Sequence, residues 1–237
     1  MRNPIIVALD VSAVERALEL AKLLAPVVGA FKIGSELFTS GGPEVVHHLR
    51  ALGASVFLDL KFHDIPNTVA KAVAAATRLD VQMLTIHISG GMEMIKAAER
   101  AAQETARACG RTAPLVLGVT VLTSLGSLQL SQLGFESDVA RQVERLSALA
   151  VQAGMRGLVC SPLEIAGLRQ LLPFHVQLVT PGIRSGAEQA DDQKRTLSPE
   201  EALAAGADWL VIGRPIYMAP DPRAAIESIL SSLSSPL

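Results

Sequence analysis

Two carboxylates and a lysine lie close together in the segment Asp59-Leu60-Lys61-Phe62-His63-Asp64. Asp59 and Lys61 are two residues apart, so in an extended strand their side chains point the same way. A charged lysine beside a carboxylate can deliver a proton to a developing carbanion. A plain ion pair is the simpler alternative, since buried pairs alone are weak evidence of function. We favour the catalytic interpretation because a second lysine, Lys32, is expected to reach the same place, and alternating charges shift one another's pKa values.

The elements that must position these residues form a regular alternation of short β-branched runs and longer segments with helical periodicity. Strands are expected at residues 5–10, 30–34, 55–61, 83–88, 115–121, 157–161, 177–180 and 209–214. Helices are expected at 14–24, 69–78, 92–108, 139–153 and 199–205. This order predicts an α/β fold, a single-domain (β/α)8 TIM barrel. An open doubly wound sheet is the alternative, but residues 10–13 do not form its usual glycine-rich turn.

Polar or charged residues stand near the ends of the expected strands, whose interiors are apolar. Because the carboxyl ends of barrel strands share one face, these residues should meet in one site. They are Asp10, Lys32, Asp59, Lys61, His87, Thr123, Ser124, Ser161, Arg184 and Arg214, and Gly213 stands beside Arg214 at the last of these ends.

A phosphate site is expected beside the seventh and eighth strands. Gly213 would let the backbone approach a phosphate closely, and Arg214 has a guanidinium fork that matches its oxygens. Residues 182–197 lack clear periodicity and follow the seventh strand, where barrels commonly bind phosphate. We interpret residues 183–196 as a lid over that phosphate.

Composition and net charge limit the kinds of molecule that the protein is expected to bind. The net charge is -2 and no long run of Lys or Arg occurs, so neither nucleic acid nor an anionic membrane surface is an expected partner. No apolar window is long enough to span a membrane. Cys109 and Cys160 have no metal-ligand spacing and suggest reduced thiols in a cytoplasmic protein. A Mg²⁺ ion needs only one or two carboxylates, but nothing in the sequence requires one.

The residues from Phe57 to Val69 resemble the signature of the orotidine 5'-phosphate decarboxylase family, in its free-standing bacterial form. The similarity continues along the chain at residues 8–10, 31–38, 118–124, 179–184 and 211–216. It implies conversion of orotidine 5'-phosphate to uridine 5'-phosphate and CO2 in pyrimidine synthesis, without cofactor or metal. It also implies that Lys61 protonates the pyrimidine carbanion, while Asp59 lies against the departing carboxylate and holds Lys61 in place.

The same resemblance implies roles for the other site residues. Lys32 and Asp10 would bind ribose hydroxyls, with Lys32 also paired to Asp59. Asp64 and Thr68 would be donated across a homodimer interface to the partner's site. The phosphate would be bound by Gln193, Arg184, Arg214 and the Gly213 amide, and the pyrimidine would lie near Thr123 and Ser124.

Two other functions stay open. A sugar-phosphate decarboxylase or epimerase that uses Mg²⁺ and an enediolate shares the Asp-x-Lys-x-x-Asp core, seen here from Asp59 to Asp64. Such an enzyme would not be expected to share the continuation to Thr68 or the segment from Thr180 to Arg184. A non-catalytic barrel that senses pyrimidine nucleotides is the other alternative, although binding alone does not need a lysine between carboxylates.

Overall fold

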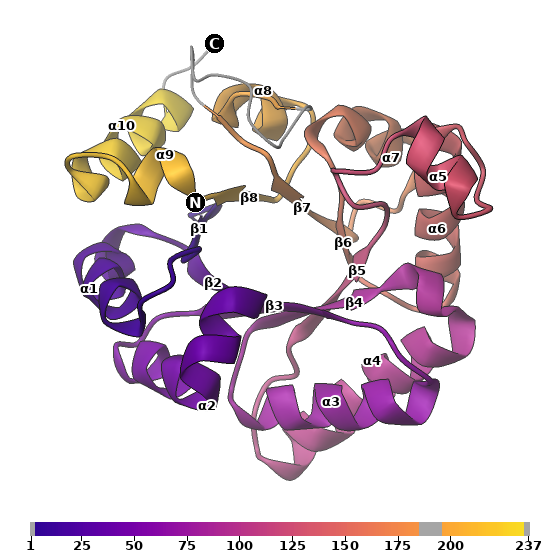
Figure 1. The fold of residues 1–237 in the computed structure, drawn as a ribbon, viewed down its shortest axis with the longest axis horizontal. Helices are drawn as coiled ribbons and strands as arrows, with labels where there is room; N and C mark the ends of the chain where they lie inside the picture. Colours follow the sequence, from indigo (N-terminus) through magenta and orange to yellow (C-terminus); the bar gives the residue numbers. More distant parts are fainter. Residues whose placement is uncertain (1–2, 185–195, 235–237) are drawn as a thin grey trace.

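A closed barrel of parallel strands forms the centre of the computed structural model, which describes residues 3–184 and 196–234. The strands pair in chain order, and β1 closes the barrel against β8 (Figure 1). Their bounds are β1 Ile5–Ala8, β2 Ala30–Gly34, β3 Val56–Phe62, β4 Met83–His87, β5 Leu115–Val119, β6 Gly157–Val159, β7 Gln177–Pro181 and β8 Trp209–Ile212. The predicted TIM barrel is confirmed.

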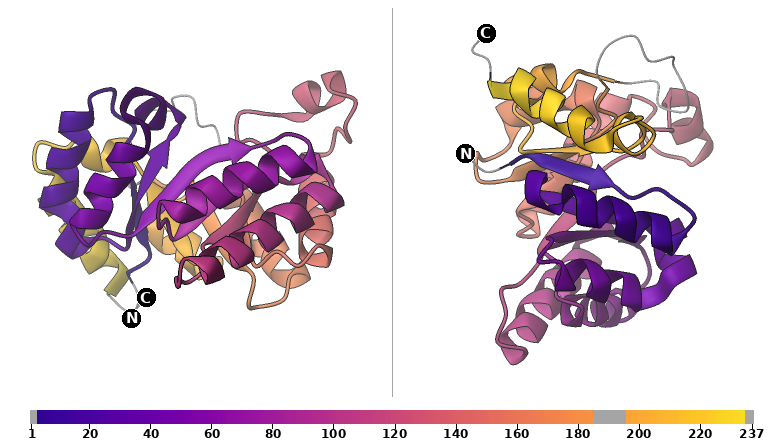
Figure 2. Two further views of the ribbon diagram at one scale, coloured as in Figure 1. Left: turned by 90° about the horizontal axis from the view of Figure 1, so that it is seen from below. Right: turned by 90° about the vertical axis from the view of Figure 1, so that its left-hand side faces the viewer.

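Helices surround this barrel on its outside (Figures 1 and 2). They are α1 Val14–Leu24, α2 Ser35–Ala51, α3 Pro66–Arg78, α4 Met92–Ala108, α5 Ser127–Gln132, α6 Val139–Gln152, α7 Ile165–Leu171, α8 Pro199–Ala204, α9 Arg214–Tyr217 and α10 Pro222–Ser234. Short 3-10 turns follow three elements, at η1 Ala25–Val27, η2 Ile88–Gly90 and η3 Pro162–Glu164. All five predicted helices are present, with ends that differ by a few residues at most.

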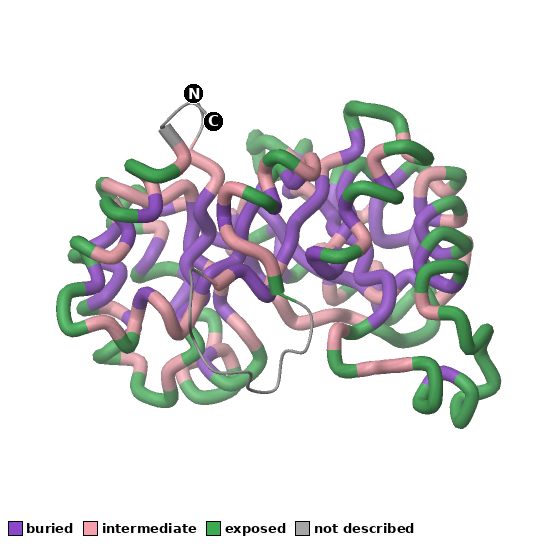
Figure 3. Tube along the Cα trace, turned by 90° about the horizontal axis from the view of Figure 1, so that it is seen from above, coloured by how far each residue is buried: buried purple, intermediate pink, exposed green. Residues whose placement is uncertain are grey.

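The core has two layers, because alternate residues of each strand face opposite sides of the sheet. Ile6 and Ala8 of β1 belong to a small cluster inside the barrel, together with Phe57 of β3 and Trp209 of β8. Their chain neighbours in β1 belong to a larger cluster that also contains the buried faces of the helices. Figure 3 shows the resulting pattern, with buried strands at the centre and exposed surfaces on the outer helices. Burial on both faces explains why the strands are apolar almost throughout.

The eighth strand ends earlier than the sequence suggests. It stops at Ile212, and Arg214 begins the short helix α9. Gly213 leaves the extended conformation, with φ -114° and ψ -99°, and Pro215 in the first turn favours a helix start. The prediction that Arg214 belongs to the strand was therefore wrong by two residues. Arg214 remains at the mouth of the barrel.

No helix among the described residues is long and apolar enough to cross a membrane.

Candidate active site

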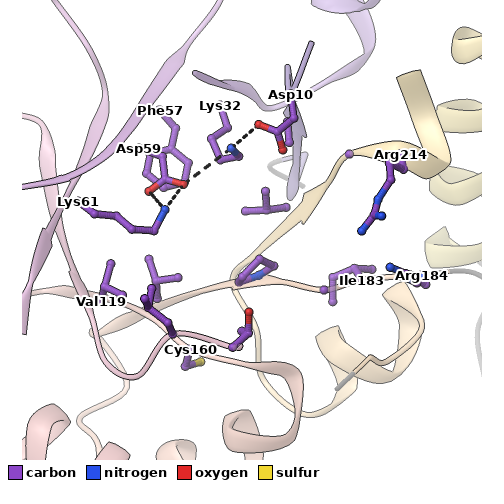
Figure 4. A pocket seen from close by; sticks show the side chains of 18 of the residues that line it. Asp10, Lys32, Phe57, Asp59, Lys61, Val119, Cys160, Ile183, Arg184 and Arg214 are labelled. Carbon is purple, nitrogen blue, oxygen red and sulfur yellow. Dashed lines mark hydrogen bonds and ion pairs between the residues drawn. The ribbon is translucent and has the colours of Figure 1, made fainter. Parts of the chain in front are cut away.

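A cavity of about 470 Å³ opens at the carboxyl ends of the strands. This volume falls within the range of small-molecule sites, roughly 300–1,000 Å³. Polar side chains from several strand ends line it, together with apolar residues such as Phe57, Val119 and Pro181 (Figure 4). The predicted residues in its wall are Asp10, Lys32, Asp59, Lys61, Thr123, Arg184, Gly213 and Arg214.

Acids and ammoniums alternate along one wall of the cavity. The Lys32 Nζ atom lies 2.8 Å from Asp10 Oδ1 and 3.8 Å from Asp59 Oδ2. The Lys61 Nζ atom donates to both carboxylate oxygens of Asp59, at 2.9 Å each. Asp59 therefore has an ammonium on each side, and these pairs link the ends of β1, β2 and β3 (Figure 4). The side chains of Lys32 and Asp59 are only 11% and 12% exposed, so water screens this charge array weakly.

The backbone at Lys61 is not the extended strand that the two-residue spacing predicts. Lys61 has φ 50°, in the left-handed region, and the pairing of β3 with β4 shifts register between Leu58 and Phe62. A left-handed conformation costs a residue with a side chain about 1–2 kcal/mol. Lys61 still meets Asp59, but through this irregularity in β3 and not through simple alternation. Strain of this kind is common at functional sites.

Thr85 is a site residue that the sequence analysis missed. Its side chain comes from β4 and is fully buried. The Thr85 hydroxyl donates to Asp59 Oδ1 at 3.0 Å and accepts the Lys61 backbone N–H at 2.9 Å. The only signal in the sequence is a hydroxyl residue within the otherwise apolar run from Met83 to Ile86.

The opposite wall comes from β7, β8 and the residues that follow them. Arg184 and Arg214 lie across the cavity from Asp59 and Lys61 (Figure 4). Gly213 and Tyr217 also line this side, and the sequence analysis did not single out Tyr217, which is the only tyrosine in the chain. Two guanidinium groups beside backbone at a helix start suit an anionic group such as phosphate.

The thiol of Cys160 also lines the cavity, from the residue after β6. Burial raises the pKa of this thiol to about 12, so it stays protonated at neutral pH. A protonated thiol is a poor nucleophile and a poor metal ligand. The structure therefore supports the interpretation of Cys160 as an inert reduced thiol.

The rings of His87 and His63 lie beside each other, with their centroids 5.4 Å apart. Burial lowers the pKa of His87 further below neutral, and the nearby His63 and Lys61 add to this effect, while Asp59 opposes it. His87 is therefore neutral at physiological pH and adds no further positive charge beside Lys61.

A family model described as "Orotidine 5'-phosphate decarboxylase / HUMPS family" matches residues 3–229. The chain belongs to this family. A relative from Opitutus terrae, named orotidine 5'-phosphate decarboxylase, is 51% identical over 99% of this chain and 100% of its own length. A relative of the same name from Pseudomonas aeruginosa is 50% identical over 98% of both chains.

A solved structure agrees with this assignment to the orotidine 5'-phosphate decarboxylase family. The crystal structure of the decarboxylase from Lactobacillus acidophilus has a TM-score of 0.87 and 36% sequence identity, and covers 98% of this chain and 100% of that chain. A second, from Pyrococcus horikoshii, has a TM-score of 0.79 at 23% identity and supports the fold alone.

Three residues predicted from the decarboxylase family lie outside the cavity of their own chain. Asp64 and Thr68 are exposed at the start of α3, and the Asp64 carboxylate accepts the Ile65 N–H at 2.6 Å. Ser124 is exposed and does not line the cavity, whereas its neighbour Thr123 does. Gln193, and with it most of the predicted lid at 183–196, falls outside the described residues.

Proposed function

We propose that this enzyme converts orotidine 5'-phosphate to uridine 5'-phosphate and CO2, in the pyrimidine pathway and in the cytoplasm. Membership of the family makes the chain a carboxy-lyase. The observation that carries the proposal is the chain of charges from Asp10 through Lys32 and Asp59 to Lys61, at the mouth of the barrel. An ammonium held against a carboxylate, as Lys61 is against Asp59, is suited to protonating a carbon and is not needed for binding alone.

Lys61 is the proposed proton donor. The bond between the pyrimidine ring and its carboxylate breaks, CO2 leaves, and the electron pair stays on the ring carbon. Lys61 gives its proton to that carbon and becomes a neutral amine. Its ammonium is already held 2.9 Å from each Asp59 oxygen, so little reorganisation is needed when negative charge develops. No cofactor takes part in this proposed step.

The rest of the cavity orients the nucleotide in this proposal. Asp59 lies beside the departing carboxylate, and Lys32 and Asp10 bind the ribose hydroxyls. Thr123 and Ser124 are assigned to the pyrimidine. The phosphate is assigned to the opposite wall, to Arg184, Arg214 and the Gly213 amide, with Gln193 and a lid at 183–196. Contacts to a phosphate far from the reacting carbon can lower the barrier, because remote binding energy offsets the cost of orientation and desolvation.

The active enzyme is proposed to be a homodimer in which Asp64 and Thr68 complete the partner's site. Both residues are exposed on their own chain, and Ile65 between them is 66% exposed. An interface between two copies would bury Ile65 and leave the neighbouring polar groups to contact the partner.

The decisive assay follows the loss of orotidine 5'-phosphate absorbance with purified protein in the presence of excess chelator. We expect turnover that the chelator does not change. Turnover of a keto-sugar phosphate alone, abolished by the chelator, would instead support the Mg²⁺-dependent alternative. Tight binding of uridine 5'-phosphate without any turnover of orotidine 5'-phosphate would identify a non-catalytic sensor.

The shared site has its own test in hybrid dimers. Asp64→Ala and Lys61→Ala proteins are each expected to be nearly inactive, because each lacks one half of the proposed catalytic set. After subunit exchange, one of the two sites in a mixed dimer has both residues intact. We expect activity to reappear on mixing, and its absence after exchange proven by differently tagged subunits would refute the shared site.

A further inference from the structure

Among the described residues, the side chain of Thr85 alone forms hydrogen bonds with both the carboxylate of Asp59 and the backbone of Lys61. Its hydroxyl donates to Asp59 Oδ1 and accepts from the Lys61 N–H. A hydroxyl has one hydrogen to donate and two lone pairs to accept with, so it can do both at once. Thr85 is fully buried, so these two contacts are protected from competition with water.

Thr85 lies opposite the part of β3 that departs from regular pairing with β4. Leu58 pairs with Leu84, and the next registered pair is Phe62 with Ile86, so β3 carries extra residues opposite Thr85. Lys61 lies within this bulge with φ 50°. A strained conformation persists only when its surroundings over-determine it. The Thr85 hydroxyl supplies an acceptor for the Lys61 N–H inside the bulge.

We propose that Thr85 is a positioning residue that fixes the reactive ammonium through two linked contacts. Accepting the Lys61 N–H holds the backbone in the left-handed conformation. Donating to Asp59 Oδ1 fixes the carboxylate plane, so that both of its oxygens face Lys61 Nζ at 2.9 Å. Thr85 does not line the cavity and acts only through these two residues. The proposal rests on the proposed function, in which Lys61 donates the proton.

A small misplacement of a catalytic group can cost roughly 100-fold in rate. Loss of the Thr85 hydroxyl should therefore lower kcat more than it weakens nucleotide binding, because the remote phosphate wall is untouched. Serine keeps a hydroxyl at this position, whereas alanine removes it and valine replaces it with a methyl group of similar shape. The three variants separate the hydroxyl from the volume of the side chain.

The experiment measures kcat and KM for orotidine 5'-phosphate, and the Kd of uridine 5'-phosphate, in Thr85→Val, Thr85→Ala and Thr85→Ser. We expect kcat to fall about 10- to 100-fold in the valine and alanine variants, with KM and Kd within about threefold of wild type. Thr85→Ser should recover kcat to within a few-fold. Thr77→Val is the matched control, because Thr77 is a buried threonine of α3 that donates to Val73 O at 2.8 Å, away from the cavity.

Equal kcat values in wild type, Thr85→Ala and Thr85→Ser would overturn the proposal. Equal losses in Thr85→Ala, Thr85→Ser and Thr77→Val would also overturn it, because they would indicate a general loss of packing. If the valine variant does not fold, the ratio of kcat between Thr85→Ser and Thr85→Ala still decides, since these variants differ only in the hydroxyl. A wild-type protein that does not decarboxylate orotidine 5'-phosphate would refute the proposed function itself, which is a separate result.

Discussion

The two walls of the cavity are built differently although both stand at the same edge of the barrel. On the wall of β1 to β3, Asp10, Lys32, Asp59 and Lys61 form ion pairs with one another, and Thr85 supports two of them from behind. On the wall of β7 and β8, Arg184 and Arg214 present guanidinium groups beside the backbone at Gly213. The first wall is preorganised by the chain's own contacts, which suits a chemical step. The second is suited to binding an anion.

The largest difference between the two walls is expected from Lys61→Ala, which should remove the chemical step and spare nucleotide binding. Removing the ammonium takes away both the proton donor and the charge that stabilises the carbanion, so kcat should fall by at least about 10⁴-fold. Binding of uridine 5'-phosphate, measured by calorimetry, should persist because the opposite wall is intact. A near-normal kcat would remove Lys61 from the mechanism. Lys22→Ala is the control, since Lys22 is an exposed lysine of α1.

A smaller effect is expected from Arg214→Ala. It should weaken the contribution of phosphate binding and leave the chemical step itself intact. Loss of charge-assisted hydrogen bonds to phosphate should lower kcat/KM for orotidine 5'-phosphate by about 10- to 100-fold. The same variant should turn over orotidine, which has no phosphate, at the wild-type rate. An equal loss with both substrates would contradict the assignment of this wall to phosphate. Arg223→Ala is a suitable control, because Arg223 pairs only with nearby Glu227 among the described residues.

The sequence predicts the barrel well because its signal is repeated along the chain. Each strand is a short apolar run buried on both faces, and each polar strand end points to the same mouth. Two of the helices not named among the expected ranges have a weak periodic signal for local reasons. In α2, Gly42 has φ 60° and precedes Pro43, so the element bends and its periodicity is interrupted. The helix α9 has 4 residues, about one turn, which is too few to establish a period of 3.6.

The site is less predictable than the fold, because several of its contacts join distant residues through irregular backbone. The pairing of Lys32 with Asp10 and Asp59 follows from their places at neighbouring strand ends. The left-handed backbone conformation of Lys61 could not be predicted from the sequence, since no glycine or asparagine stands at that position. Thr85 could be found only from its register with β3, and that register changes at the bulge.

A buried carboxylate outside both walls, Glu99, has surroundings that contrast with those of Asp59. Glu99 of α4 is only 7% exposed, and its Oε1 atom has no hydrogen-bond partner among the described residues. Burial raises the pKa of Glu99 to about 7, and the attraction of Arg156 opposes this only in part. Asp59 is also largely buried but has Lys32 and Lys61 on either side and a hydroxyl donor in Thr85. The carboxylates of Glu99 and Asp59 are both largely buried, and they differ in their charged and hydrogen-bonding partners.

The last prediction tests that contrast through stability and leaves the cavity and its catalytic rate untouched. Glu99 binds its proton more tightly in the folded state, with a pKa near 7, than in an unfolded chain, where the ordinary value is 4.5. The folded state therefore loses stability as pH rises through that window, by an amount on the order of 3 kcal/mol in total. Glu99→Gln has no such titration, so its unfolding free energy relative to wild type should increase between pH 5 and 8 and then level off.

Urea unfolding at several pH values measures this difference directly. Glu104→Gln is the control, because Glu104 is an exposed residue of the same helix and should give a nearly constant difference from wild type. A pH-independent difference for Glu99→Gln would mean that Glu99 gains partners in solution and titrates as an ordinary carboxyl group. In that case, burial without an ammonium would no longer distinguish Glu99 from Asp59. A rise confined to Glu99→Gln would support the view that burial without a paired cation sets Glu99 apart from Asp59, which has Lys32 and Lys61 on either side.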